Sequence, residues 1–483
     1  MVGPQPKIAV PTPEPVAAES RFARHPAAFV LASVGLLIPC FWQSRLQAGD
    51  LSSHLYNAWL AQLIERDQAP GLSTAFQATN VLFDLLLKAL FGALGAGPAQ
   101  RIAVAFCVLV FAWGAFAFVS KVSGRLAWRM LPWIAVLSYG WVFHIGFFNF
   151  YLSLGICFWA LSMAWNLEVP RMRVASALLV VAYIAHGLPV VWSIVVLAYV
   201  WTARRIDPVR QSLLLGGAVL AIVVLRLVLS ATMLTRWYGR QITLIGFDQA
   251  WVFDEKYLIV TMLGLTMSTL WFARLTERRS LPLQVCLLTA AGIYILPTAV
   301  LIPGYKHLLV YIAERMSLAL AVCMLATLGA AVSRAWDRYL TIAAVVLFFA
   351  FLYRDEGRLN SFEDRIDAAV AQIPERQRVI AGFDHPGLRV NALAHMIDRA
   401  CVGRCYSYSN SEPSTAQFHV RVTGPTPIVA ATYKDSFDMQ TGTYVVKETD
   451  LPLYQLLGDE QGNIQIRIPP PGRLSGATAW KGF

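Results

Sequence analysis

Charged side chains are scarce in this chain. Asp, Glu, Lys and Arg make up 14% of its 483 residues, whereas hydrophobic residues make up 57%. A soluble protein of this size carries about 25% charged residues. This scarcity excludes an ordinary soluble fold and indicates that bilayer hydrocarbon is the solvent for much of the chain.

Acidic residues are also fewer than basic ones, 29 against 40, which gives a net charge of +11. In a soluble protein such an excess would suggest nucleic acid as a partner. Here Lys and Arg fall in short clusters between apolar runs, which is how a membrane protein sets its orientation. We therefore expect membrane lipids, and no nucleic acid, as partners.

Cysteine spacings typical of zinc or redox sites are missing. Five of the seven cysteines lie in apolar runs, where a thiol packs as a small hydrophobe. Cys401 and Cys405 lie in the polar tail and could form a disulfide in an oxidising compartment. The sequence indicates no metal site and leaves the cofactor unknown, with a divalent metal ion still conceivable.

Apolar runs long enough to cross a bilayer recur along the chain, since a span needs about 20 residues and somewhat fewer where the bilayer is thin. The eleven candidate spans are 27–43, 101–120, 130–145, 148–167, 174–186, 188–202, 212–230, 257–273, 281–302, 308–331 and 339–353. The run 81–94 is shorter and holds Asp84 and Lys88. We expect it to be an interfacial or re-entrant helix with these two residues paired at i,i+4.

The positive-inside rule supports this threading. With the N-terminus inside, every cytoplasmic loop is basic, provided that the chain turns at His186. The basic residues of these loops are Lys121, Arg125, Arg129, Arg171, Arg173, Arg204, Arg205, Arg210, Arg274, Arg278, Arg279, Arg334 and Arg338. The predicted location is the bacterial cytoplasmic (inner) membrane, with the tail outside the cytoplasm.

Three parts follow from the threading. Residues 1–26 form a disordered cytoplasmic N-terminus, with no convincing cleavage site after the first apolar run. Residues 27–353 form an all-α polytopic membrane domain, whose first outside loop is 44–100. Residues 354–483 form a small α/β extracytoplasmic domain, for which helices are expected at 363–373 and 391–400 and strands at 378–382, 428–433 and 443–446.

The first outside loop carries the leading candidate residues. Asp50 begins a predicted amphipathic interfacial helix whose polar face also holds Ser53, His54 and Asn57. Asp50 could simply cap this helix. Alternatively it is a catalytic carboxylate, which hydrocarbon nearby makes a better base for a hydroxyl proton. His54, one turn on, could share a proton or a metal ion with it.

The order of these segments resembles the GT-C glycosyltransferase superfamily, in particular the branch of lipid-A aminoarabinose transferase and the protein mannosyltransferases. It runs from a basic flank and a span to Gly49-Asp50, an interfacial helix, a second one at 80–91, and a span led by Arg101. In that family an acidic residue of the first outside loop, often written Asp-Glu, is catalytic. Asp50 matches the Asp, whereas Leu51 stands where the Glu commonly is.

The stretch from Pro303 to His307 is similar to the basic-aromatic segment that contacts the donor phosphate in many members. The resemblance implies a GT-C-like fold and transfer of a sugar from a polyprenyl-phosphate donor to a lipid, glycan or protein acceptor at the outer membrane face, with inversion. Asp50 would take the acceptor proton, and Lys306, His307 or Arg315 would steady the leaving phosphate.

The other candidates are polar residues at outer ends of spans. Lys306, His307 and Arg315 form either a phosphate-binding cluster or ordinary snorkelling anchors. Intramembrane charges such as Glu314 and Arg315 usually face a cavity or each other. The candidate substrate-binding residues are Asn57, Asp84, Lys88, His144, His186, Lys306, His307, Glu314 and Arg315, and Asn149 could line the same cavity.

Two rival classes stay open. A transporter or lipid flippase would show inverted repeats and broken helices at mid-depth. No internal repeat is visible, and the polar residues crowd toward one face of the predicted bundle. A non-catalytic membrane scaffold that presents the tail is the second alternative.

Overall fold

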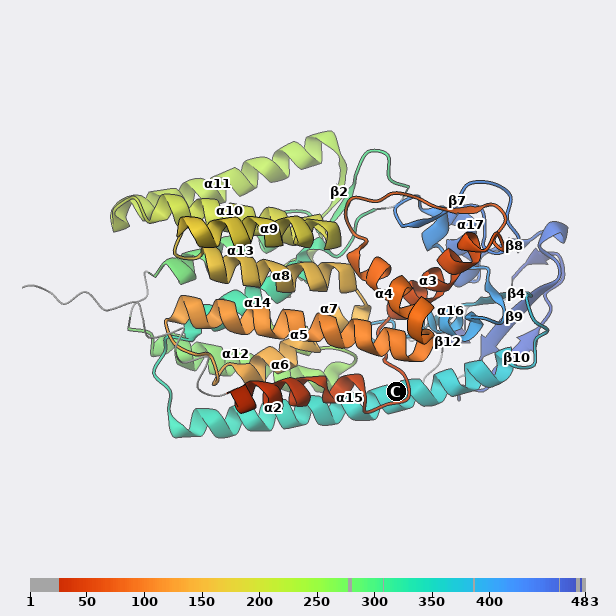
Figure 1. Ribbon diagram of the computed structural model, residues 1–483, viewed down its shortest axis with the longest axis horizontal. Coiled ribbons are helices and arrows are strands. Elements are labelled where there is room, and N and C mark those ends of the chain that lie inside the picture. The colour runs from red at the N-terminus through yellow and green to blue at the C-terminus, as the bar shows by residue number, and fades with distance from the viewer. Residues whose placement is uncertain are drawn as a thin grey trace, which may run out of the picture.

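The computed structural model describes residues 26–276, 280–306, 308–384, 387–459, 461–474 and 478–479. Of the segments singled out by sequence, residues 1–25, Arg278, Arg279 and His307 lie outside these ranges. The molecule is mostly helical and elongated. Helices lie side by side along its long axis, and the C-terminal residues form a smaller mixed part at one end (Figure 1).

The elements are as follows. The helices are α2 (Pro26–Leu37), α3 (Leu51–Glu65), α4 (Leu82–Leu94), α5 (Ala96–Ser123), α6 (Leu131–Ser138), α7 (Trp141–Ile145), α8 (Phe148–Ala164), α9 (Val169–Ala185), α10 (Gly187–Ala203), α11 (Pro208–Thr232), α12 (Leu258–Ala273), α13 (Leu281–Ile295), α14 (Ile312–Leu328), α15 (Ala335–Val370), α16 (Met396–Cys401) and α17 (Tyr433–Gln440). The strands are β1 (Leu72–Thr74), β2 (Leu234–Arg236), β3 (Ala299–Leu301), β4 (Arg378–Ala381), β5 (Phe383–Asp384), β6 (Tyr406–Ser407), β7 (Val420–Val422), β8 (Val445–Val446), β9 (Leu453–Gly458), β10 (Ile464–Arg467), β11 (Gly472–Arg473) and β12 (Thr478–Ala479).

Several helices suit a membrane environment by length and composition. Four described ones are long and apolar enough to cross a bilayer: Ala96–Ser123, Pro208–Thr232, Glu255–Ala273 and Ala335–Val370. Shorter apolar helices are Pro26–Cys40, Leu131–Ile145, Phe148–Ala164, Gly187–Ala203 and Leu281–Ile295. These features are consistent with a helical membrane protein, and the count of eleven spans stays a prediction.

The turn expected at His186 is confirmed. α9 ends at Ala185, α10 begins at Gly187, and His186 between them has extended backbone angles. Its Nδ1 accepts a hydrogen bond from the backbone N–H of Leu188 at 3.2 Å. The imidazole therefore caps α10, which explains why the apolar run 174–202 does not continue as one helix.

Basic residues of the expected cytoplasmic loops lie at one end of the bundle. The guanidinium groups of Arg125 and Arg129 both donate to the carbonyl of Gly329, just after α14. Arg274, just after α12, pairs with Asp337 in the first turn of α15 at 2.8 Å. These ends lie away from the C-terminal part, as Figure 1 shows.

The C-terminal part is built around a four-stranded sheet of order β10-β9-β4-β6, in which β4 is parallel to both of its neighbours. α15 continues through residue 353, where the membrane domain was expected to end, and reaches Val370. The strand predicted at 378–382 corresponds to β4, and the one at 443–446 to β8. The strand predicted at 428–433 is wrong, because this segment forms none and α17 begins at Tyr433.

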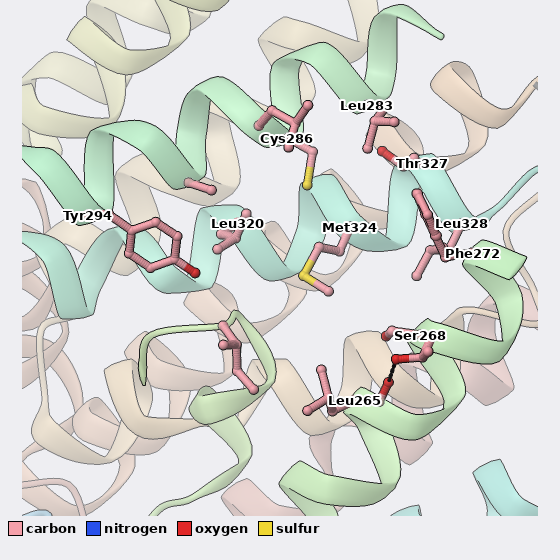
Figure 2. Close-up of a pocket in the computed structure, with 14 residues that line it drawn as sticks. Leu265, Ser268, Phe272, Leu283, Cys286, Tyr294, Leu320, Met324, Thr327 and Leu328 are labelled. Carbon is pink, nitrogen blue, oxygen red and sulfur yellow. Dashed lines mark hydrogen bonds between the residues drawn. The ribbon is translucent and has the colours of Figure 1, made fainter. Parts of the chain in front are cut away.

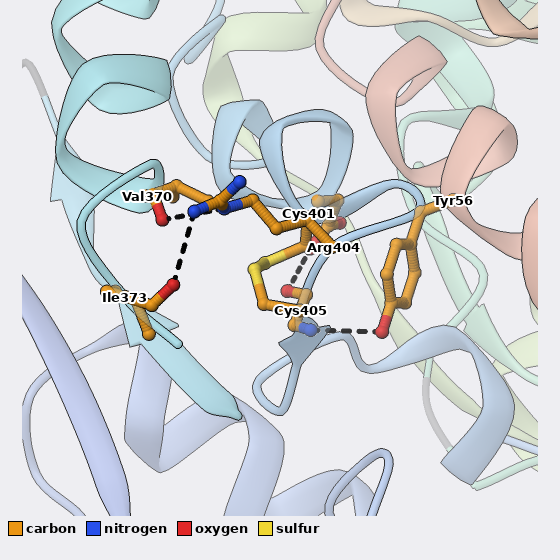
Figure 3. Close-up of a disulfide and its surroundings, with 8 residues drawn as sticks. Tyr56, Val370, Ile373, Cys401, Arg404 and Cys405 are labelled. Atoms are coloured by element: carbon orange, nitrogen blue, oxygen red, sulfur yellow. Dashed lines mark hydrogen bonds between the residues drawn. A yellow bond between two sulfur atoms is a disulfide. The ribbon is translucent and has the colours of Figure 1, made fainter. Parts of the chain in front are cut away.

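The tail pairs with an earlier part of the chain and is cross-linked within itself. β7 of the tail pairs with β1 of the segment 44–100, with Leu72 opposite Val422. Cys401 and Cys405 form a disulfide at the end of α16. Figure 3 shows that Arg404, which lies between the two cysteines in sequence, donates to the carbonyls of Val370 and Ile373. Its guanidinium therefore caps the C-terminal end of α15.

Two glycines allow α5 and α8 to pack closely. A Cβ built on Gly114 of α5 would lie 2.4 Å from the carbonyl oxygen of Gly155 in α8. A Cβ on Gly155 would lie 2.7 Å from the Cα of Phe111. Because these contacts are to backbone atoms, a side chain at either position would have to push the helices apart.

We therefore expect Gly155→Ala to lower the melting temperature of the detergent-solubilised protein by several degrees. The physical reason is overpacking, which costs about 1–3 kcal/mol in a packed core. Gly216→Ala in α11 is the matched control, because nothing lies within 4 Å of a Cβ at that position. An equal effect of the two substitutions would show that the α5–α8 contact does not depend on glycine.

Candidate functional site

Asp50 precedes α3 but does not cap it. Its side chain makes no capping hydrogen bond, so the capping interpretation of this residue is wrong. The backbone of Asp50 is held by the turn that follows α7, because its N–H donates to the carbonyl of Ile145 at 3.0 Å. Gly146 has φ +95°, and a Cβ there would lie 2.5 Å from the Asp50 nitrogen. The carboxylate is 35% exposed.

A histidine of the tail approaches this carboxylate. His395 Nε2 lies 3.9 Å from Asp50 Oδ1, while its Nδ1 is 2.8 Å from Asp398 Oδ2. Burial lowers the pKa of His395, but the hydrogen bond and charge of Asp398 outweigh it and raise the pKa to about 9. The imidazole is therefore charged at neutral pH. Because it lies next to one oxygen of the Asp50 carboxylate, a ligand has to approach the carboxylate from another side.

Asp398 is itself held firmly. Its carboxylate accepts from the hydroxyl of Ser407 and from Asn410 Nδ2, the latter at 3.1 Å. Sequence reasoning missed this pair. The only signal was the His-x-x-Asp spacing of residues 395 and 398, which places both side chains on one side of a helical turn. Nothing in the sequence indicated that this turn packs near Asp50.

α3 is not the exposed interfacial helix that its polar face suggested. Most of its residues are buried, Ser53, His54 and Asn57 included. His54 Nδ1 lies 2.6 Å from Asp84 Oδ1 of α4. The imidazole hydrogen that was expected to be shared with Asp50 is therefore shared with Asp84.

The expected Asp84–Lys88 pair is also wrong. Lys88 Nζ lies 2.5 Å from Glu65 at the end of α3. The second oxygen of Asp84 accepts from Asn149 Nδ2 of α8 at 2.8 Å. Asp84 thus faces α3 and α8, and Lys88 faces the end of α3, so each finds its partner on another helix.

A second carboxylate of the tail lies beside this cluster. Asn57 Nδ2 donates to Glu412 Oε2 at 2.9 Å. Burial raises the pKa of Glu412 to about 7, against the opposing charge of His54. Asn57, Asp84, Glu412 and His419 help to line a cavity of about 20 Å³, enough for one water molecule. Glu412 carried no sequence signal, because only folding of the tail brings it here.

Arg315 lies in the first turns of α14 and is 9% exposed. Its guanidinium carbon is 3.6 Å from the ring centroid of Phe147, and its Nη1 is 3.4 Å from His186 Nε2. The negative charges of Asp50 and Glu314 both act on it. Glu314 instead accepts a hydrogen bond from the hydroxyl of Thr298.

The remaining predicted site residues lie apart. His144 is fully buried, and its Nδ1 is 2.9 Å from the carbonyl of Gln47, so it supports the chain that leads to Asp50. Lys306 is exposed, and its Nζ lies 3.5 Å from the carbonyl of Ser414 in the tail. The structure therefore places Asp50 and Arg315 against the turn at 145–147, with His186 beside Arg315. His54, Asn57 and Asp84 form a separate group where α3 contacts α4 and the tail.

An apolar cavity of about 360 Å³ lies between α12, α13 and α14. Figure 2 shows Leu320 and Met324 of α14 directed into it, with Phe272 and Cys286 on the other walls. Leu320 is five residues beyond Arg315, which turns it by about 140° around the helix axis. The cavity therefore opens on a different side of α14 from the Arg315 group.

No protein-family model, no curated protein and no solved structure matches the chain. Across the described ranges, no group of three or more His, Cys, Asp or Glu residues is arranged to hold a metal ion. The functional argument is therefore carried by the chemistry of the site: an accessible carboxylate, an imidazolium beside it and a buried guanidinium.

Stability should depend on pH through His54. Burial lowers the pKa of this imidazole, but the charge and hydrogen bond of Asp84 outweigh it and raise the pKa from 6.5 to about 10. A raised pKa means that the stabilisation is fully present below pH 6.5 and is lost as pH rises through about 10. We expect the melting temperature to fall over this range, and to fall less in His54→Gln.

The control for this prediction is His419→Gln, which removes a histidine whose Nδ1 lies 2.8 Å from a backbone carbonyl, that of Ala75. It should keep the pH dependence of the wild type. Because His395 titrates in part of the same range, His54→Gln should retain a smaller slope. An unchanged slope in His54→Gln would mean that the His54–Asp84 pair contributes no net stability.

Proposed function

We propose that this protein is an integral-membrane glycosyltransferase of GT-C type. It transfers a sugar from a polyprenyl-phosphate donor to a lipid, glycan or protein acceptor at the outer face of the bacterial cytoplasmic membrane. Eleven spans, an inside N-terminus and an outside tail belong to this proposal. The position of the basic loops at the end away from the tail supports that orientation.

One observation supports the activity most strongly: a partly exposed carboxylate and a buried guanidinium flank the same turn. Gly146 is in contact with the backbone of Asp50, and the next residue, Phe147, lies against Arg315. Neighbouring Cα atoms are only about 3.8 Å apart, so the segments that carry the acid and the cation meet at this turn, and the charge of Asp50 acts on the guanidinium. A base beside a cation is what displacement of a phosphate by a hydroxyl requires.

In the proposed reaction, Asp50 accepts the proton of the acceptor hydroxyl while the oxygen of that hydroxyl attacks the anomeric carbon of the donor sugar. The bond between that carbon and the phosphate oxygen breaks, and the lipid phosphate leaves with its added negative charge. Arg315 stabilises this charge. Attack from the side opposite the phosphate inverts the anomeric configuration.

Residues of the tail belong to the proposed site. His395, held by Asp398, positions the Asp50 carboxylate and leaves its exposed oxygen for the acceptor. His54 and Asn57 are buried under the tail and engaged with Asp84 and Glu412. Their role is therefore to hold the wall of the site, and not to contact the acceptor as the sequence suggested.

The direct test is Asp50→Asn, expressed in a strain in which loss of the gene changes a surface glycan. We expect the variant to restore less than about one hundredth of the wild-type transfer rate, the size of a lost general base. The measurement is the mass profile of the surface glycans, with protein levels matched by immunoblot.

Asp367→Asn is the matched control. This carboxylate is 38% exposed and paired with a cation, Arg45, on the tail side of α15. It should restore the glycan to the wild-type level. If Asp50→Asn is made normally and restores the glycan as well as Asp367→Asn does, the enzyme proposal has to be abandoned.

A further inference from the structure

Three aromatic rings lie between the Asp50 segment and Arg315. The ring centroid of Tyr311 is 5.6 Å from that of Trp141 and 6.0 Å from that of Phe147. Phe147 in turn lies under the Arg315 guanidinium, and its neighbour in sequence contacts Asp50. We call Trp141, Phe147 and Tyr311 the aromatic cluster.

Tyr311 differs from the other two rings in its exposure. Trp141 is 3% exposed, whereas Tyr311 is 42% exposed. A large ring that is packed on one side and open on the other presents a flat surface to a ligand. The Asp50 carboxylate is among the charges that act on the Tyr311 hydroxyl.

The backbone of Tyr311 adopts an unusual conformation. Its φ is +60°, in the left-handed region that residues with a Cβ rarely occupy. This turn starts α14, since the carbonyl of Tyr311 accepts the N–H of Arg315 at 3.0 Å. Tyr311, with this unusual backbone, thus places both its own ring and the Arg315 guanidinium against Phe147.

We propose that Tyr311, supported by Phe147 and Trp141, is the stacking surface for the sugar ring of the donor. The C–H face of a sugar ring is apolar, and its weakly positive hydrogens pack well on the negative face of an aromatic ring. A sugar on Tyr311 has its phosphate toward Arg315 and its anomeric carbon toward Asp50. This inference rests on the proposed glycosyltransferase function and assigns the place of the sugar within it.

The experiment compares ligands with and without a sugar. The full-length protein in detergent is titrated calorimetrically with farnesyl phosphate and with farnesyl phosphates that carry glucose, mannose, galactose or arabinose. At least one sugar-bearing compound should bind about fivefold to tenfold more tightly than farnesyl phosphate, the size of one good aromatic contact.

Three variants locate the effect. Tyr311→Asn removes the ring, and Asn tolerates the left-handed backbone, so it should lose the preference for the sugar while its affinity for farnesyl phosphate stays unchanged. Tyr311→Phe should keep the preference. Tyr339→Asn is the matched control, because Tyr339 is also an exposed tyrosine, at 72%, and lies near the start of α15 at the other end of the bundle. It should behave as the wild type.

The outcomes separate the inference from the proposed function. If the wild type binds farnesyl phosphate but shows no preference for any sugar, the stacking surface is refuted while the lipid-phosphate site stands. The same holds if Tyr311→Asn keeps the preference, in which case Tyr311 is an interfacial anchor. If the wild type binds none of these compounds, the proposed donor is wrong and the inference fails with it.

Discussion

The polar face of α3 is covered by protein, and every group on it must find a partner away from water. A buried polar group without a hydrogen bond costs several kcal/mol, which makes this the strictest constraint in the described structure. The tail supplies two of these partners: Asn410 Nδ2 donates to Ser53 Oγ at 3.0 Å, and Glu412 accepts from Asn57. The position of the tail on the bundle, and of His395 with it, follows from these bonds.

The apolar face of α3 is held to the same body. Tyr56 is fully buried, and its hydroxyl accepts the backbone N–H of Ser407 at 2.9 Å. Figure 3 shows this bond beside the Cys401–Cys405 disulfide. Ser407 also donates to Asp398, so one short strand connects α3 to the residue that holds His395. The tail is therefore connected to the Asp50 carboxylate through a few direct contacts, which run from Ser407 through Asp398 to His395.

The part of the site that adjoins the helical bundle depends on close packing around the turn at 145–147. Gly146 lets the chain of Asp50 pass against the turn at 145–147, and Phe147 carries the contact on to Arg315. A side chain at Gly146 would separate the carboxylate from the cation. The arrangement thus joins an acid that precedes α3 to a cation of α14 without a direct ion pair between them, which leaves both groups able to act on a ligand.

The sequence by itself determined the helical membrane character and the turn at His186, because these follow from composition, local pattern and the cost of charge in hydrocarbon. It could not determine which partner each polar residue chooses. Asp84 and Lys88 look like a natural pair along one helix, yet each bonds to α3. His395 and Glu412 come from a tail that no pattern connected to residue 50. Only the tertiary structure decided these, since a buried polar group takes whichever partner folding brings within reach, however far away in sequence.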